Sequence, residues 1–138
     1  MNDHDEKHQQ RMAKKKAIVD ARIAAAQEER GILILLKGNG KGKSSSALGT
    51  MARSLGYGKK CAVIQFIKGQ NETGEQRFFQ DHPLVDWHVM GHGFTWETQD
   101  KSQDIAAAEK AWELAAQLLQ DETYDFLLFD EMSYMFKY

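Results

Sequence analysis

The sequence predicts an α/β protein: a mainly parallel sheet with helices on both faces, preceded by an N-terminal helix. Two observations predict this class. Short, continuous apolar runs recur along the 138 residues, and segments of helical periodicity separate them. A glycine-rich turn also joins the first apolar run to the helix that follows it. Strands that alternate with crossover helices pair in parallel and bury both faces of their sheet.

The N-terminal segment, residues 1–30, is predicted to be a polar tail and an amphipathic helical arm. Residues 9–30 are rich in Ala, Lys, Glu and Arg, which favour helix. Met12, Val19 and Ile23 fall near one face of that helix. The arm either packs on its own domain or lies over a ligand or a partner subunit, and the sequence favours neither.

Residues 31–138 are predicted to form one α/β domain. The first strand is Ile32-Leu33-Ile34-Leu35-Leu36, a continuous apolar run typical of a strand buried on both faces. The remaining predicted elements are a helix over 44–55, a strand over 61–67, a polar loop over 68–74, a short helix over 75–80, a strand over 84–90, a helix over 104–120 and a strand over 126–129.

The turn after the first strand has the composition of a phosphate-binding loop. It reads Gly38-Asn39-Gly40-Lys41-Gly42-Lys43-Ser44 and runs directly into the predicted helix. Glycines let several backbone N–H groups converge on an anion, a lysine meets the phosphates, and a serine hydroxyl ligates their Mg²⁺. We therefore predict that residues 38–45, Ser45 included, bind the triphosphate of ATP, and that the fold is P-loop NTPase-like. Lys37 stands where the usual spacing of this motif has its first glycine.

Two acidic residues, Asp130 and Glu131, follow the last apolar run. The carboxyl ends of parallel strands are the edge at which ligands bind. A carboxylate there can hold a metal ion opposite Ser44, directly or through water. Ser44, Asp130 and Glu131 are therefore our candidate metal ligands.

Composition and charge exclude several other classes of protein. The net charge of −2 argues against binding nucleic acid through the overall field. The single cysteine, Cys61, cannot form an internal disulfide and reads as a small buried residue. Because the chain shows neither a signal peptide nor a membrane-spanning run, we expect a cytoplasmic protein without a membrane partner.

Four segments together resemble the P-loop ATP:corrinoid adenosyltransferases. They are Gly38 to Ser46, Val63-Ile64-Gln65-Phe66-Ile67-Lys68-Gly69, Gly93-Phe94-Thr95-Trp96-Glu97-Thr98-Gln99, and Phe129-Asp130-Glu131-Met132-Ser133-Tyr134. The resemblance runs from about Arg11 onward. The combination of the loop with the Gly-Phe-Thr-Trp-x-Thr-Gln segment is more specific than either part alone.

The resemblance implies transfer of the 5′-deoxyadenosyl group of ATP to the Co(I) centre of a corrinoid, either cob(I)alamin or cobinamide. Lys41, Lys43 and Ser44, with Mg²⁺ or Mn²⁺, would then hold the leaving triphosphate. Phe94 and Trp96 would lie beside the corrinoid and displace the lower cobalt ligand. The resemblance further implies a homodimer and a reductant, for which a flavoprotein is the candidate.

The chain departs from the family pattern in two ways. Ser44 and Ser45 occupy positions where many relatives have threonine, and the chain ends at Tyr138, so we expect a C-terminally shortened domain. Two alternatives also remain open. The loop and its acidic partner alone equally allow a small-molecule kinase or ATPase. A non-catalytic ATP- or corrinoid-binding module is the third interpretation.

Overall fold

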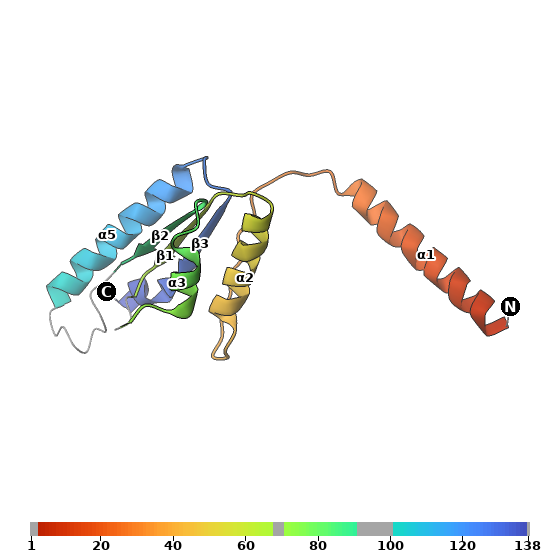
Figure 1. Ribbon diagram of the computed structural model, residues 1–138, viewed down its shortest axis with the longest axis horizontal. Helices are drawn as coiled ribbons and strands as arrows, with labels where there is room; N and C mark the ends of the chain where they lie inside the picture. The colour runs from red at the N-terminus through yellow and green to blue at the C-terminus, as the bar shows by residue number, and fades with distance from the viewer. Residues whose placement is uncertain (1–2, 68–70, 91–100, 138) are drawn as a thin grey trace. The chain divides into compact units, whose positions relative to one another are not determined.

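The computed structural model describes residues 3–67, 71–90 and 101–137, and it divides the chain into two compact units (Figure 1). The N-terminal unit is Met1–Leu36, and the sheet unit is Lys37–Tyr138. None of the helices in these described ranges is long and apolar enough to cross a membrane.

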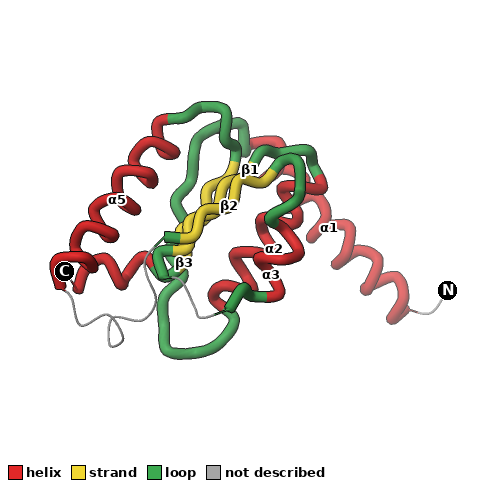
Figure 2. The backbone as a smooth tube through the Cα atoms, turned by 60° about the vertical axis from the view of Figure 1, so that its left-hand side comes forward, coloured by secondary structure: helices red, strands yellow, loops and turns green. Residues whose placement is uncertain are grey.

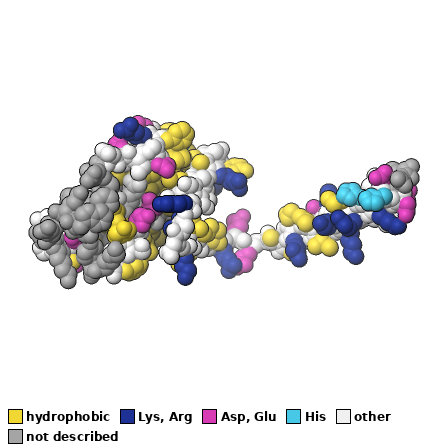
Figure 3. All heavy atoms as spheres, turned by 90° about the horizontal axis from the view of Figure 1, so that it is seen from below, with side chains coloured by type: hydrophobic (Ala, Val, Ile, Leu, Met, Phe, Trp, Pro, Cys, Tyr) yellow, Lys and Arg dark blue, Asp and Glu magenta, His cyan; other side chains and the backbone are white. Residues whose placement is uncertain are grey.

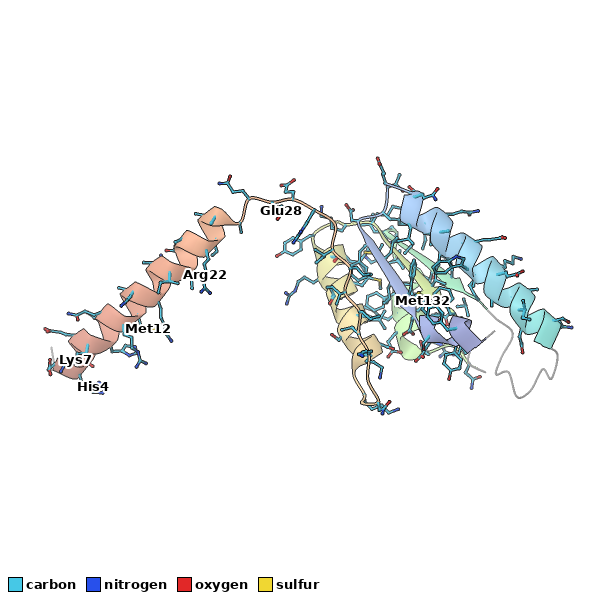
Figure 4. All side chains as sticks on the ribbon, turned by 180° about the vertical axis from the view of Figure 1, so that it is seen from behind. His4, Lys7, Met12, Arg22, Glu28 and Met132 are labelled. Carbon is cyan, nitrogen blue, oxygen red and sulfur yellow. The ribbon has the colours of Figure 1, made fainter. Side chains whose placement is uncertain are left out.

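The N-terminal unit contains α1, Asp3–Ala25. Acidic residues occupy its first turn, where they complement the positive end of the helix dipole. Salt bridges one turn apart, Lys7–Asp3 at 2.7 Å and Lys16–Asp20 at 2.9 Å, lie on its surface. No residue of α1 is buried in this structure; Figure 3 shows its basic and apolar side chains interspersed, and Figure 4 labels Met12 among them. The predicted helix therefore exists, but it begins and ends earlier than residues 9–30.

The prediction of a buried strand over residues 32–36 is wrong for this structure. The segment has no regular secondary structure, and its side chains are exposed, from 43% at Leu36 to 96% at Leu33. A strand exists only when a neighbouring strand supplies hydrogen-bond partners. The apolar run predicted a strand, but a local pattern carries no information about the neighbour that the strand needs.

The sheet unit is built on three parallel strands in the order β2-β1-β3 within the described residues. These are β1, Cys61–Gln65; β2, Val85–Val89; and β3, Phe126–Asp130. The strands are in step: Cys61 lies opposite Val85 on one side and Phe126 on the other. The predicted parallel sheet is thus confirmed, with β1 as its most buried strand.

Helices cover both faces of this sheet, as Figure 2 shows. One face packs against α2, Lys43–Gly56, and α3, Gly74–Phe79; the other packs against α5, Lys101–Gln120. Alternate residues of β1 divide between two cores, because successive side chains of a strand point to opposite faces. The first core holds Leu48, Met51, Cys61, Val63, Phe79 and Val85. The second holds Ala62, Ile64, Phe66, Ala111, Ala115 and Leu118, with Met132 of the 3-10 helix η1, Met132–Lys137, packed against it.

A polar brace ties the amino ends of the three strands together. The Tyr124 hydroxyl donates to the Asp86 carboxylate, while Lys60 Nζ lies 3.9 Å from Asp86 Oδ2 and 4.4 Å from the centroid of the Tyr124 ring. The Lys60 N–H donates to Asp125 Oδ2 at 2.9 Å. The hydrogen bond to Asp86, helped by burial, raises the pKa of Tyr124 to about 12. The brace leaves the opposite, carboxyl edge of the sheet for the loops that could bind a ligand.

Candidate phosphate-binding site

The glycine-rich loop turns into α2 through two glycines in the left-handed region of backbone space. Gly38 has φ 132° and Gly42 has φ 104°. Such angles are strained for any residue with a Cβ, so this path requires glycine at both positions. Gly42 is the N-cap of α2, and no side chain caps the helix there. The first N–H groups of α2 therefore remain available to an anion.

Lys43 folds back over this loop. Its half-buried side chain donates from Nζ to the carbonyl oxygens of Gly38 and Gly40, at 2.7 Å each. These two bonds hold the loop curled around an ammonium group. Phosphate oxygens can replace the two carbonyls, since a charged acceptor makes a stronger hydrogen bond with an ammonium than a neutral one does.

Ser44 and Asp130 meet across the unit, although they are 86 positions apart in the sequence. Ser44 Oγ donates to Asp130 Oδ1 at 2.8 Å, in a half-buried setting. Asp130 is the last residue of β3, and Ser44 lies in the first turn of α2. The structure therefore brings the candidate metal ligands of the loop and of the acidic strand end into contact.

Glu131 lies at the turn that leaves β3. It is exposed, and its φ of 58° puts it in the left-handed region, at a cost of about 1 kcal/mol for a residue other than glycine. Its carbonyl accepts from the Tyr134 N–H at 3.1 Å, which starts η1. Glu131 thus redirects the chain immediately after Asp130.

The remaining predicted site residues fall into two groups. Asn39, Lys41 and Ser45 are exposed on the loop and in the first turn of α2. Phe94 and Trp96 lie outside the described residues.

The side-chain oxygens of Ser44 and Asp130 suit a hard cation that also binds phosphate oxygens. No group of three or more His, Cys, Asp or Glu able to hold a metal ion occurs within the described residues. Mg²⁺, however, commonly takes only one or two protein ligands and completes its shell with phosphate oxygens and water. Ser44 Oγ and Asp130 Oδ1, held at 2.8 Å, fit that pattern.

Sequence reasoning missed one polar pair at the same edge of the sheet. The Trp87 indole N–H donates to Gln65 Oε1 at 3.1 Å, and Gln65 lies in register with Asp130. A polar residue at the end of the buried run Cys61-Ala62-Val63-Ile64 was the signal that could have pointed to it.

Comparison with known proteins identifies what the chain is similar to. Residues 29–138 match the family described as ATP:corrinoid adenosyltransferase BtuR/CobO/CobP, and residues 1–23 match the cob(I)alamin adenosyltransferase N-terminal family. A corrinoid adenosyltransferase of Pseudomonas aeruginosa is 55% identical over 135 residues, which are 97% of this chain and 66% of the relative. Corrinoid adenosyltransferases of Escherichia coli and Salmonella typhimurium are each 48% identical over 134 residues, which are 97% of this chain and 68% of each relative. The chain thus spans about two thirds of the length of these relatives.

Proposed function

Since this chain belongs to the ATP:corrinoid adenosyltransferase family, we propose that it transfers the 5′-deoxyadenosyl group of ATP to the cobalt of a reduced corrinoid. The Co(I) electron pair forms the new bond to C5′ of the ribose, the C5′–O bond breaks, and its electrons leave with intact triphosphate. The observation that carries the proposal is the curled loop, with Lys43 inside it and Ser44 against Asp130.

The loop acts on the leaving group in this reaction. Because the cobalt is itself the nucleophile, the protein needs no serine, cysteine or histidine to attack the substrate. Its contribution is to position ATP and to stabilise the charge that develops on the departing triphosphate. When ATP binds, Lys43 Nζ donates to phosphate oxygens in place of the two loop carbonyls. The exposed Lys41 adds a second positive charge to the loop.

Ser44 and Asp130 would supply oxygen ligands for a divalent cation, Mg²⁺ or Mn²⁺, and Glu131, next in the chain, would supply a third directly or through water. Such a cation would neutralise charge on the triphosphate.

The corrinoid site is the part of the proposal that rests on the family resemblance. From that resemblance, Phe94 and Trp96 would lie beside the corrinoid and exclude the lower axial ligand, which would favour the electron-rich, ligand-poor cobalt. The acceptor is cob(I)alamin or cobinamide, the reductant is a flavoprotein, and the protein works as a cytoplasmic homodimer. Residues 31–138 form the nucleotide-binding domain.

One assay tests the reaction class. The full chain is incubated anaerobically with ATP, Mg²⁺ and chemically reduced corrinoid; light-sensitive product and tripolyphosphate are expected in equal amounts. Lys43→Ala is expected to abolish both, whereas Lys110→Ala, an exposed lysine of α5, leaves them unchanged. Release of ADP instead of tripolyphosphate would contradict the proposal and would indicate phosphoryl transfer. Nucleotide binding without any turnover would instead indicate a non-catalytic module.

A further inference from the structure

Gln65 is a polar residue at the carboxyl end of an otherwise buried strand. The four preceding residues of β1 are 0–1% exposed, whereas Gln65 is half-buried. Side chains two apart on a strand share a face, so Gln65 lies on the α2 side of the sheet with Val63. Its register partner on β3 is Asp130, whose side chain reaches Ser44 of α2 and so lies on that same side. Gln65 therefore lies next to the candidate phosphate and metal site.

Trp87 fixes which way the Gln65 carboxamide faces. An indole N–H can only donate, so the atom 3.1 Å from Trp87 Nε1 must be the amide oxygen. The NH₂ group at the other end of the amide is turned away from Trp87. Trp87 belongs to β2, on one side of β1, while Asp130 belongs to β3, on the other. A carboxamide whose oxygen faces Trp87 can therefore turn its donors toward the side of β1 where Ser44 and Asp130 lie.

We propose that Gln65 is a further substrate-binding residue, which donates from Nε2 to an oxygen of the triphosphate chain held by the loop, with Trp87 as its positioning residue. This inference rests on the proposed function and extends it to a residue outside the glycine-rich loop. A carboxamide adds a directional donor without a further positive charge. Next to a carboxylate such as Asp130, an uncharged donor also leaves the metal ligand free of a competing ion pair.

The competing interpretation is a purely structural tie between β1 and β2. Both interpretations predict that loss of the Trp87–Gln65 bond changes stability. Only the proposed role predicts that the affinity for a phosphate chain changes when the fold stays intact. The test therefore measures affinity and stability separately on the same variants.

The experiment titrates inorganic tripolyphosphate with Mg²⁺ into the full chain by calorimetry, without corrinoid. Gln65→Glu keeps the shape and the acceptor for the Trp87 indole, so it is expected to fold; because it replaces the donors with a negative charge, affinity is expected to fall by more than about 10-fold. Gln65→Leu removes the donors together with the acceptor for the Trp87 indole, and it is expected to weaken binding by roughly 10-fold. Gln117→Glu and Gln117→Leu, at an exposed position of α5, are the matched controls and should stay at the wild-type affinity.

Trp87→Phe tests the positioning step. It keeps a smaller aromatic ring against the core and removes the indole donor, so the carboxamide is free to turn over. Binding is expected to weaken by about 3-fold, less than for Gln65→Leu, because the correct orientation is still populated. Trp112→Phe, whose ring is 50% exposed on α5, is the control and should not change the affinity.

The outcomes separate this inference from the proposed function. Wild-type affinity in folded Gln65→Glu and Gln65→Leu overturns the inference and leaves adenosyl transfer standing. Binding that depends on Gln65, in a chain that transfers no adenosyl group, supports the inference and removes the proposed function. If the wild-type chain does not bind tripolyphosphate, both are wrong.

Discussion

The hydrogen bond from Ser44 to Asp130 joins the first turn of α2 to the end of β3, and it predicts a measurable energetic coupling between the two residues. Removing the hydroxyl with Ser44→Ala, the carboxylate with Asp130→Ala, and both together closes a double-mutant cycle. A hydrogen bond to a charged group contributes about 1.5–3 kcal/mol. Because this pair, at 2.8 Å, is only half-buried, we expect a coupling near the lower end, about 1.5 kcal/mol.

The cycle is measured by urea denaturation and checked by thermal unfolding. The sheet unit spans Lys37–Tyr138, and for about 100 residues a loss of 1.5 kcal/mol lowers Tm by roughly 6–9 °C. Thr50→Ala is the control: its hydroxyl also donates a hydrogen bond, at 3.0 Å, but to a backbone carbonyl within the same helix and in the open, so the change should stay within about 0.5 kcal/mol. Ser44→Thr should keep the coupling. If the effects of Ser44→Ala and Asp130→Ala add to within about 0.3 kcal/mol, the contact makes no contribution in solution and the argument fails.

Three further predictions follow from burial and from the raised pKa values. Met51 is 0% exposed in the first core, so Met51→Ala should cost about 2–5 kcal/mol in urea denaturation, whereas Leu119→Ala, at 60% exposure on α5, should cost less than about 0.5. Tyr124 has a pKa of about 12 in the folded state against 10.0 as its ordinary value, so its contribution is complete below pH 10 and is lost as the pH rises through about 12; Tyr124→Phe should flatten the fall in Tm between pH 10 and 12, and an unchanged slope would contradict the Asp86 hydrogen bond as its cause. Burial, and then the Asp125 charge, raise the pKa of Cys61 to about 11, so a disulfide reagent at pH 8 should label this thiol only as fast as the protein unfolds; rapid labelling of the native chain would show that the thiol is accessible.

Most of the fold could be predicted because the decisive signals are local. The predicted helix over 44–55 is observed as Lys43–Gly56, and the predicted strand over 126–129 as Phe126–Asp130. The strand over 84–90 and the helices over 75–80 and 104–120 agree with β2, α3 and α5 to within three residues at each end. Apolar periodicity carries this information because each element buries its own face.

Residues 32–36 mark the limit of that reasoning. An apolar run is necessary for a doubly buried strand, but the strand also needs a neighbour whose backbone hydrogen-bonds to it, and that neighbour can lie anywhere in the sequence. The same limit applies to the site. The composition of the loop predicted Lys43 and Ser44 as phosphate and metal ligands, and the structure adds that both are already engaged, by loop carbonyls and by Asp130.

The pairs that were missed depend on register. Trp87 meets Gln65, and Tyr124 meets Asp86, because the parallel strands align in one particular way. A shift of one residue in its strand would send Gln65, Trp87 or Asp86 to the opposite face of the sheet. No pattern within a single strand contains that alignment, so these contacts could be read only from the assembled sheet.

The uncapped start of α2 at Gly42 has a consequence for how the protein resists unfolding. With no serine, threonine or aspartate side chain on its leading amides, this helix lacks a stabilising contact that most helices carry within themselves. A bound anion would supply that contact from outside. The free energy of unfolding should therefore rise with the concentration of the ligand, by about 2.7 kcal/mol when the free ligand is at 100 times its dissociation constant.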